Sequence, residues 1–136
     1  MVNIIDFGFR LFDKWLYIMR SGNTLKSFFD DNDYKKIAIY GMGRIGKQLY
    51  AELKAVDVDI SILIDRNAKC LKDLYNNIIT LNELPTFKNI DVIVITPVQF
   101  YSEIERQIYE INQDIDVVSV EDVVEYVYRK QVGENG

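Results

Sequence analysis

The chain has 136 residues, 49% of them hydrophobic and 27% charged, which is the composition of one ordinary globular domain. Its net charge of −5 argues against nucleic acid as a partner, and its lack of histidine removes every catalytic triad or metal site that needs an imidazole. A single cysteine, Cys70, excludes an internal disulfide and leads us to expect a cytoplasmic protein, in which Cys70 acts as a small apolar filler.

The sequence pattern near the N-terminus predicts a helix over residues 4–20, and Gly22 is suited to end it. Its apolar side chains cover an arc of roughly 200°, twice the ~100° that a helix needs to dock on its own domain. Trp15 and Phe12 lie near the middle of that arc. We therefore expect residues 4–20 to form a homodimer or to bind a partner enzyme, with docking inside the chain as the alternative. No apolar run is long enough to predict a transmembrane segment.

A short helix near residues 24–30 precedes a strand–helix alternation that continues to the end of the chain. Strands are predicted at 37–40, 60–64, 78–80, 91–96 and 117–120. Helices are predicted at 44–56, 67–76, 99–112 and 121–130, with a helical turn at 82–84 that Pro85 stops. The predicted fold is α/β, a doubly wound open parallel sheet of order 3-2-1-4-5. The expected organisation is a helical extension (1–33), a Rossmann-like domain (34–130) and a flexible tail (131–136).

The most informative motif follows the first sheet strand, where the chain reads Gly41-Met42-Gly43-Arg44-Ile45-Gly46. This Gly-x-Gly-x-x-Gly turn opens a helix, and Asp65 ends the next strand about 20 residues later, the distance typical of dinucleotide-binding folds. Gly41 suits the tight turn after the strand, and Gly43 allows the close approach of a pyrophosphate. Gly46 allows the helix to pack on the sheet. The helix N-terminus favours phosphate binding, so all six loop residues are candidate cofactor contacts.

Four further residues complete the predicted site. Asp65 can accept the hydroxyl groups of an adenosine ribose, and its charge favours NAD over NADP, whose 2′-phosphate it repels. Arg66 can stack on adenine or instead neutralise a 2′-phosphate, and Arg44 can reach the pyrophosphate. Thr96 and Pro97 end the fourth strand beside the glycine turn, where the sheet order reverses.

Residues 34–128 resemble small Rossmann domains of bacterial surface-polysaccharide and nucleotide-sugar pathways. The resemblance rests on the glycine turn, on Asp65-Arg66-Asn67, and on the strands at 91–97 and 117–122. Similar domains precede the catalytic part of membrane-linked nucleotide-sugar epimerase/dehydratases and form the C-terminal domain of sugar C-methyltransferases. The fourth strand also resembles that of the Gfo/Idh/MocA oxidoreductases, but their Lys-Pro segment and catalytic histidine are missing here.

The resemblance implies a nucleotide-binding module of a polysaccharide pathway, with NAD, or alternatively NADP, CoA or a UDP-sugar, as the ligand. No residue pattern predicts a catalytic acid, base or nucleophile, and nothing suggests a metal site. We therefore expect no catalysis by this chain alone. Two alternatives stay open: a minimal NAD-dependent oxidoreductase or epimerase completed by a partner subunit, and an interaction domain with a vestigial pocket.

Overall fold

The computed structural model describes residues 4–135, and it shows a parallel five-stranded sheet of order β3-β2-β1-β4-β5. This confirms the predicted α/β fold and strand order. The strands are β1 (Ile37–Tyr40), β2 (Ile60–Ile64), β3 (Ile78–Ile79), β4 (Val92–Ile95) and β5 (Asp116–Ser119). The central strands β1 and β4 are buried along their whole length, as their unbroken apolar sequences require when helices cover both faces.

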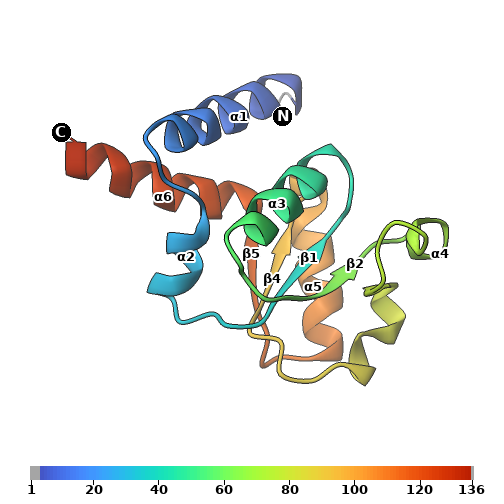
Figure 1. The fold of residues 1–136 in the computed structure, drawn as a ribbon. Helices are drawn as coiled ribbons and strands as arrows, with labels where there is room; N and C mark the ends of the chain where they lie inside the picture. Colours follow the sequence, from blue (N-terminus) through green and yellow to red (C-terminus); the bar gives the residue numbers. More distant parts are fainter. Residues whose placement is uncertain (1–3, 136) are drawn as a thin grey trace.

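Helices cover both faces of the sheet (Figure 1). The longer helices α3 (Arg44–Ala55) and α6 (Val120–Asn135) pack on one face, where α1 (Ile4–Arg20) and α2 (Lys26–Asp31) join the same hydrophobic cluster. The short helix α4 (Ala68–Leu71) also contributes to that cluster. The opposite face is covered by α5 (Tyr101–Ile111) and by the 3-10 helix η1 (Leu81–Thr86). Alternate residues of the strands divide between these two clusters, as the pleat of a sheet requires, except at the start of β2, where the register with β1 shifts.

Several element boundaries differ from those predicted. Pro85 lies inside η1 rather than stopping it, because its fixed φ suits a 3-10 helix and only one N–H is lost. A separate 3-10 turn, η2 (Val98–Phe100), precedes α5. The final helix continues to Asn135, and Gln131 is buried within it, so the segment expected to be a tail is helical as far as Asn135. Cys70 is exposed, so it does not fill the core.

The N-terminal helix α1 belongs to the domain core through one of its sides. Leu11, Trp15 and Ile18 are buried, and the Trp15 side chain is only 4% exposed. Trp15, near the middle of the apolar arc, therefore faces the domain and does not lie on the uncovered part of the arc. The wide arc gives α1 two apolar sides, and only one of them faces the domain.

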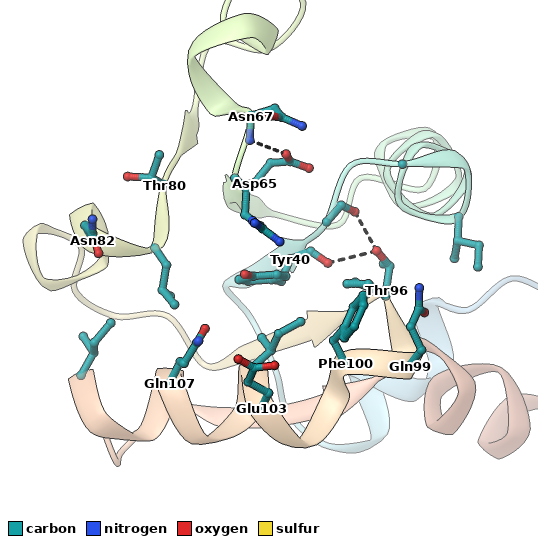
Figure 2. Close-up of a pocket in the computed structure, with 18 of the residues that line it drawn as sticks. Tyr40, Asp65, Asn67, Thr80, Asn82, Thr96, Gln99, Phe100, Glu103 and Gln107 are labelled. Atoms are coloured by element: carbon teal, nitrogen blue, oxygen red, sulfur yellow. Dashed lines mark hydrogen bonds between the residues drawn. The ribbon is translucent and has the colours of Figure 1, made fainter. Parts of the chain in front are cut away.

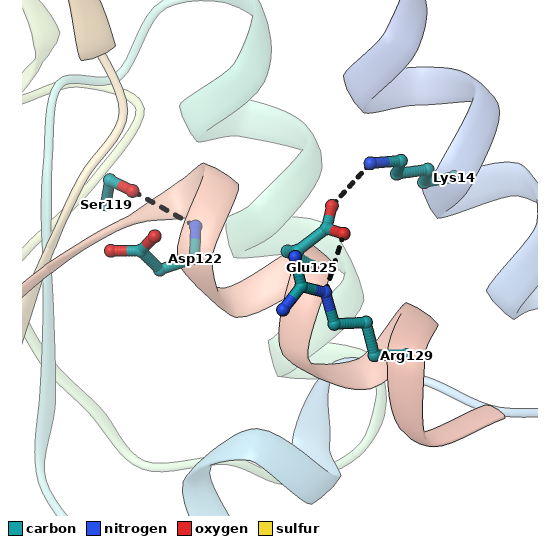
Figure 3. Close-up of polar contacts among 5 residues, drawn as sticks. All are labelled: Lys14, Ser119, Asp122, Glu125 and Arg129. Atoms are coloured by element: carbon teal, nitrogen blue, oxygen red, sulfur yellow. Dashed lines mark hydrogen bonds and ion pairs between the residues drawn. The ribbon is translucent and has the colours of Figure 1, made fainter. Parts of the chain in front are cut away.

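Two carboxylates hold α1 and the segment that follows it. The Glu52 carboxylate on α3 accepts hydrogen bonds from Trp15 Nε1 (2.8 Å) and from the backbone N–H of Leu25 (2.9 Å). On α6, the carboxylate of Glu125 pairs with Lys14 of α1 and with Arg129 (Figure 3). Lys14 holds the pKa of Glu125 below its usual value, outweighing the opposite effect of burial, and Arg129 adds to the lowering. The N-terminal segment is thus an integral layer of the domain.

The outer side of α1 exposes large apolar side chains. Phe9 is 74% exposed, Ile5 is similarly exposed, and Leu16 and Met19 are each about half exposed. With the partly buried Phe12, these residues are spaced alternately by four and three positions, which forms a continuous stripe along the helix. Within residues 4–135, no helix is long and apolar enough to cross a membrane.

Candidate functional site

A cleft of about 1450 Å³ opens above the carboxyl ends of the central strands. It lies where the strand order reverses between β1 and β4, the position at which open α/β sheets bind ligands. Eight of the ten predicted site residues line it, namely Gly41, Gly43, Arg44, Ile45, Asp65, Arg66, Thr96 and Pro97. The fold therefore brings together residues from the ends of three strands and from the first turn of α3.

Gly41 makes the tight turn at the end of β1. Its φ of +94° lies in the left-handed region, where a side chain is strained. A Cβ at this position would also lie 2.6 Å from Thr96 Oγ1 and 2.7 Å from Pro97 Cδ. The Thr96 hydroxyl points at the carbonyl oxygens of Tyr40 (3.0 Å) and Gly41 (2.8 Å), to which it donates its hydrogen bond (Figure 2). Thr96 and Pro97 thus form the surface against which the glycine turn is packed.

Gly46 lies in the first turn of α3 and packs closely on the glycine turn. A Cβ built at Gly46 would lie 1.9 Å from the carbonyl oxygen of Gly41 and 3.5 Å from Met42 Sδ. The tight contact is therefore between the helix and the preceding turn, more than between the helix and the sheet. Gly46 does not line the cleft.

Gly43 differs from the other two glycines because the space around it is open. It is the N-cap residue of α3, and a Cβ added there would meet no atom within 4 Å. No side chain caps the helix, so its first-turn N–H groups lack the usual side-chain acceptor. Arg44 and Ile45 follow directly and line the cleft. An anion placed beside Gly43 would meet backbone donors, the positive end of the helix dipole and a nearby guanidinium.

Asp65 holds the glycine turn to the end of β2. Its Oδ2 accepts the backbone N–H of Met42 at 2.7 Å. Its Oδ1 accepts the N–H of Asn67 at 2.8 Å (Figure 2). A carboxylate has about four lone-pair positions, so two remain for a ligand. The side chain is only partly buried and faces the cleft. Asp65 therefore has a structural role that its position in the sequence did not reveal.

Met42 is placed differently from the other loop residues. Its side chain is buried in the core cluster beneath α3, and its backbone N–H is already bonded to Asp65. Met42 does not line the cleft. Of the six loop residues predicted as cofactor contacts, Met42 and Gly46 thus shape the turn, and the other four face the cleft.

The wall that α5 contributes to the cleft was not predicted from the sequence. Four polar residues spaced along one side of η2 and α5 line the cleft: Gln99, Glu103, Gln107 and Glu110. Gln99, Glu103 and Gln107 come from this wall in Figure 2, together with Phe100, and they face Thr80 and Asn82 across the cleft. Their spacing by three and four residues was visible in the sequence, but it is also the pattern of a solvated helix face.

Tyr40, at the carboxyl end of β1, lies in the centre of the cleft and is 7% exposed. Burial raises the pKa of its phenol above the ordinary value, and Arg66 opposes that rise. Asp65 and Glu103 raise the Tyr40 pKa further, so charges from β2 and α5 act on the same hydroxyl. The described residues contain no group of three or more histidine, cysteine, aspartate or glutamate side chains that could hold a metal ion.

Comparison with known proteins identifies the family but no activity. Neither a curated protein nor a solved structure matches the chain. The sequence model of the family described as C2185-like, N-terminal, matches residues 33–126, which is more than half of the chain. The matched segment begins before β1 and includes the glycine turn and all five strands, whereas α1 lies outside it. It contains every residue that lines the cleft except Ile4 of α1. The chain belongs to the C2185-like N-terminal family.

Proposed function

We propose that this protein is a nucleotide-binding module of a bacterial surface-polysaccharide or nucleotide-sugar pathway, with NAD as its leading ligand. The observation that carries the proposal is the open space at Gly43, beside uncapped N–H groups of α3 and at the edge of a large cleft. The pathway rests on the sequence resemblance alone.

Three features of the cleft support a phosphate-containing ligand. Its glycine-turn side offers backbone donors that lack a side-chain acceptor. Arg44, in the first turn of α3, supplies a positive charge on the same side. The turn itself is held by Asp65 and by Thr96, so its donors stay in place without a ligand. No protein atom lies within 4 Å of the position that a Cβ would take at Gly43. A phosphate can therefore approach Gly43 closely without displacing any part of the protein.

NAD is favoured over NADP because Asp65 places a negative charge where a ribose would bind. Its two remaining lone-pair positions can accept ribose hydroxyl groups but would repel a 2′-phosphate. CoA and UDP-sugars remain as alternative ligands, since both also carry a diphosphate that the glycine turn could bind.

We expect the chain to bind its ligand without catalysing a reaction. The chain contains no histidine, and two carboxylates at the cleft are already engaged: Asp65 with backbone N–H groups, and Glu110 with Arg106 at 2.6 Å. The alternatives are an oxidoreductase or epimerase completed by a partner subunit, and an interaction domain with a vestigial pocket.

Titration calorimetry of the full chain against NAD, NADH, NADP, CoA and UDP-sugars tests the proposal. We expect micromolar binding of NAD and weaker binding of NADP. Gly43→Val should abolish that binding, because its side chain occupies the phosphate position, while the melting temperature changes little. Absence of binding across the whole panel would overturn the proposal and favour a vestigial pocket.

The role of Asp65 needs a variant that keeps the glycine turn in place. Asp65→Ala would remove the acceptors of both Met42 and Asn67, so it tests the turn as well as the ligand. Asp65→Asn keeps one acceptor oxygen and removes the charge. We expect it to weaken NAD binding by ~1–3 kcal/mol and to narrow the preference over NADP. If Asp65→Asn bound NAD as tightly as the wild type does, and likewise NADP, Asp65 would be excluded from the ligand site.

We also infer that the outer stripe of α1 mediates self-association into a two-fold dimer. Phe9, Leu16 and Met19 are exposed on this stripe, and their spacing with Phe12 is that of helices packed side by side. A second copy offers the same stripe, as a two-fold interface requires. In an antiparallel arrangement, Asp6 in the first turn of one helix approaches the last turn of the other, which carries Arg20.

Light scattering at micromolar concentrations measures the mass independently of shape. We expect a dimer for the wild type and a folded monomer for Phe9→Glu, whose change lies on the outer stripe. Asp13→Asn, an exposed change on the same helix outside the stripe, should remain dimeric. A monomeric wild type would overturn the inference, and a monomer that binds another protein instead would assign the surface to a partner enzyme.

A further inference from the structure

The two sides of the cleft carry opposite charge. Arg44 lies beside the glycine turn, whereas α5 contributes Glu103 and Glu110. Glu110 is paired with Arg106, so the unpaired negative charge on this wall is that of Glu103. Asp65 also lies on the glycine-turn side, but its carboxylate already accepts two backbone N–H groups. The phosphates are therefore favoured beside Gly43 and Arg44, because Glu103 would repel them at α5, and the base then lies toward α5.

The α5 wall offers hydrogen-bonding groups that no part of the described chain uses. Glu103 and Gln107 are one helical turn apart, and both point toward the cleft (Figure 2). Within residues 4–135, neither side chain has a hydrogen-bond partner, whereas neighbouring Glu105 accepts a bond from the Tyr101 hydroxyl at 2.9 Å. Glu103 is an acceptor only, and the amide of Gln107 can both accept and donate.

We propose that Glu103 and Gln107 recognise the base of the bound nucleotide and select adenine over uracil. This inference rests on the proposed nucleotide-binding function and identifies the ligand class within it. The amino group of adenine donates to a carboxylate or amide oxygen, and an adjacent ring nitrogen accepts from the amide N–H, so an amide matches adenine at two points.

Uracil matches this wall less well than adenine. Its N3–H can donate to Glu103, but two carbonyl oxygens flank that N–H and would meet the acceptor-only carboxylate with like partial charge. A mismatched polar group in a cleft costs affinity because the protein and ligand atoms both lose water without gaining a bond. The wall therefore disfavours UDP-sugars among the ligands considered above.

The centre of the cleft provides surfaces for a flat ring. Tyr40 lies there, and Arg66 lines the same cleft from the end of β2. Apolar side chains from both walls, Leu81 and Ile104, also line the cleft. A guanidinium plane stacks favourably on a base, and the apolar side chains replace the water that the base loses. Glu103 lines the same cleft from α5, so the stacking and edge-binding groups border one space.

Calorimetric titration of the full chain with ADP, CDP, GDP and UDP tests the base preference directly. We expect ADP to bind at least about tenfold more tightly than UDP, the discrimination that one well-matched base edge provides. Tighter binding of UDP, or of any other diphosphate in the panel, than of ADP would overturn the assignment to adenine. The nucleotide-binding proposal would then still stand, whereas no binding of any of the four would overturn both.

A variant pair separates base recognition from a general effect of charge. Glu103→Gln lets the wall donate as well as accept, so we expect the ratio of ADP to UDP affinity to fall by at least about fivefold, partly through tighter UDP binding. Glu105→Gln removes the same charge from the same helix but lies outside the cleft lining, and its ratio should match the wild type. If Glu103→Gln changed the affinities for ADP and UDP by the same factor, the proposed role of Glu103 would be overturned.

Discussion

Replacing Gly46 by alanine should destabilise the protein, although alanine is the better helix former. The new Cβ would lie 1.9 Å from the Gly41 carbonyl oxygen. Carbon–oxygen contacts normally lie at about 3.3 Å or more, so the turn and the helix must separate by roughly 1.4 Å. Both colliding parts are backbone, and no side chain can rotate away.

The size of the effect follows from two opposing contributions. Overpacking of this kind costs up to ~3 kcal/mol, and alanine recovers ~1 kcal/mol through its helix propensity. The net loss of about 2 kcal/mol corresponds to a melting temperature lower by roughly 8 °C for a domain of this size. Urea denaturation should give the same free-energy difference with an unchanged m-value.

Gly43→Ser is the matched control within the same turn. Its side chain meets open space and can cap α3, so its stability should stay within ~0.5 kcal/mol of the wild type. If Gly46→Ala were as stable as the wild type, or if Gly43→Ser were equally destabilised, our assignment of the close-packed and open glycines would be refuted.

Three further predictions concern the N-terminal layer and the sheet edge. Glu52→Gln keeps one acceptor for Trp15 and Leu25, so urea denaturation should show a loss of ~1–3 kcal/mol, whereas the exposed Glu121→Gln should have no effect. Lys14 lowers the pKa of Glu125, so the contact stabilises the fold above pH 4.5 and this stabilisation is lost as the pH falls below that value. Below pH 4.5, the near-ultraviolet circular dichroism signal of Trp15 should therefore change in the wild type, and it should change less in Glu125→Gln. Burial, followed by the hydrogen bond to Asp116, raises the pKa of Tyr34 from 10.0 to about 12. The stabilisation from this contact is therefore present below pH 10.0 and is lost as the pH rises toward 12. If the wild type showed a phenol that titrates at pH 10 and that is missing from Tyr34→Phe, this prediction would be contradicted.

The sheet and the glycine turn could be predicted from the sequence because local patterns determine them. The apolar β-branched run at 92–95 identifies a buried strand, and the right-handed crossover rule then orders the strands. Which side of α1 is buried could not be predicted, because an apolar arc gives its own width but not the position of its contacts. The contact that buries Trp15 is long-range, because its partner Glu52 lies 37 residues further along the chain on α3.

The candidate site shows the same division between local and long-range information. Gly41, Gly43 and Gly46 were assigned from their spacing alone. Gly41 makes the tight turn as predicted, Gly46 packs on that turn more than on the sheet, and the phosphate contact of Gly43 stays a prediction. The second role of Asp65 depends on a contact with Met42 across two strands, which no spacing reveals. Glu103 and Gln107 resemble an ordinary solvated helix face until the position of the cleft is known.

The two hydrogen bonds of Asp65 have a consequence for the rate of ligand binding. Because this carboxylate already holds Met42 and Asn67, the turn needs no ordering when a ligand arrives. A preorganised loop saves the entropy that a mobile loop would lose on binding. Association should then proceed in one kinetic phase that is linear in ligand concentration, because no slow closure step precedes the bound state.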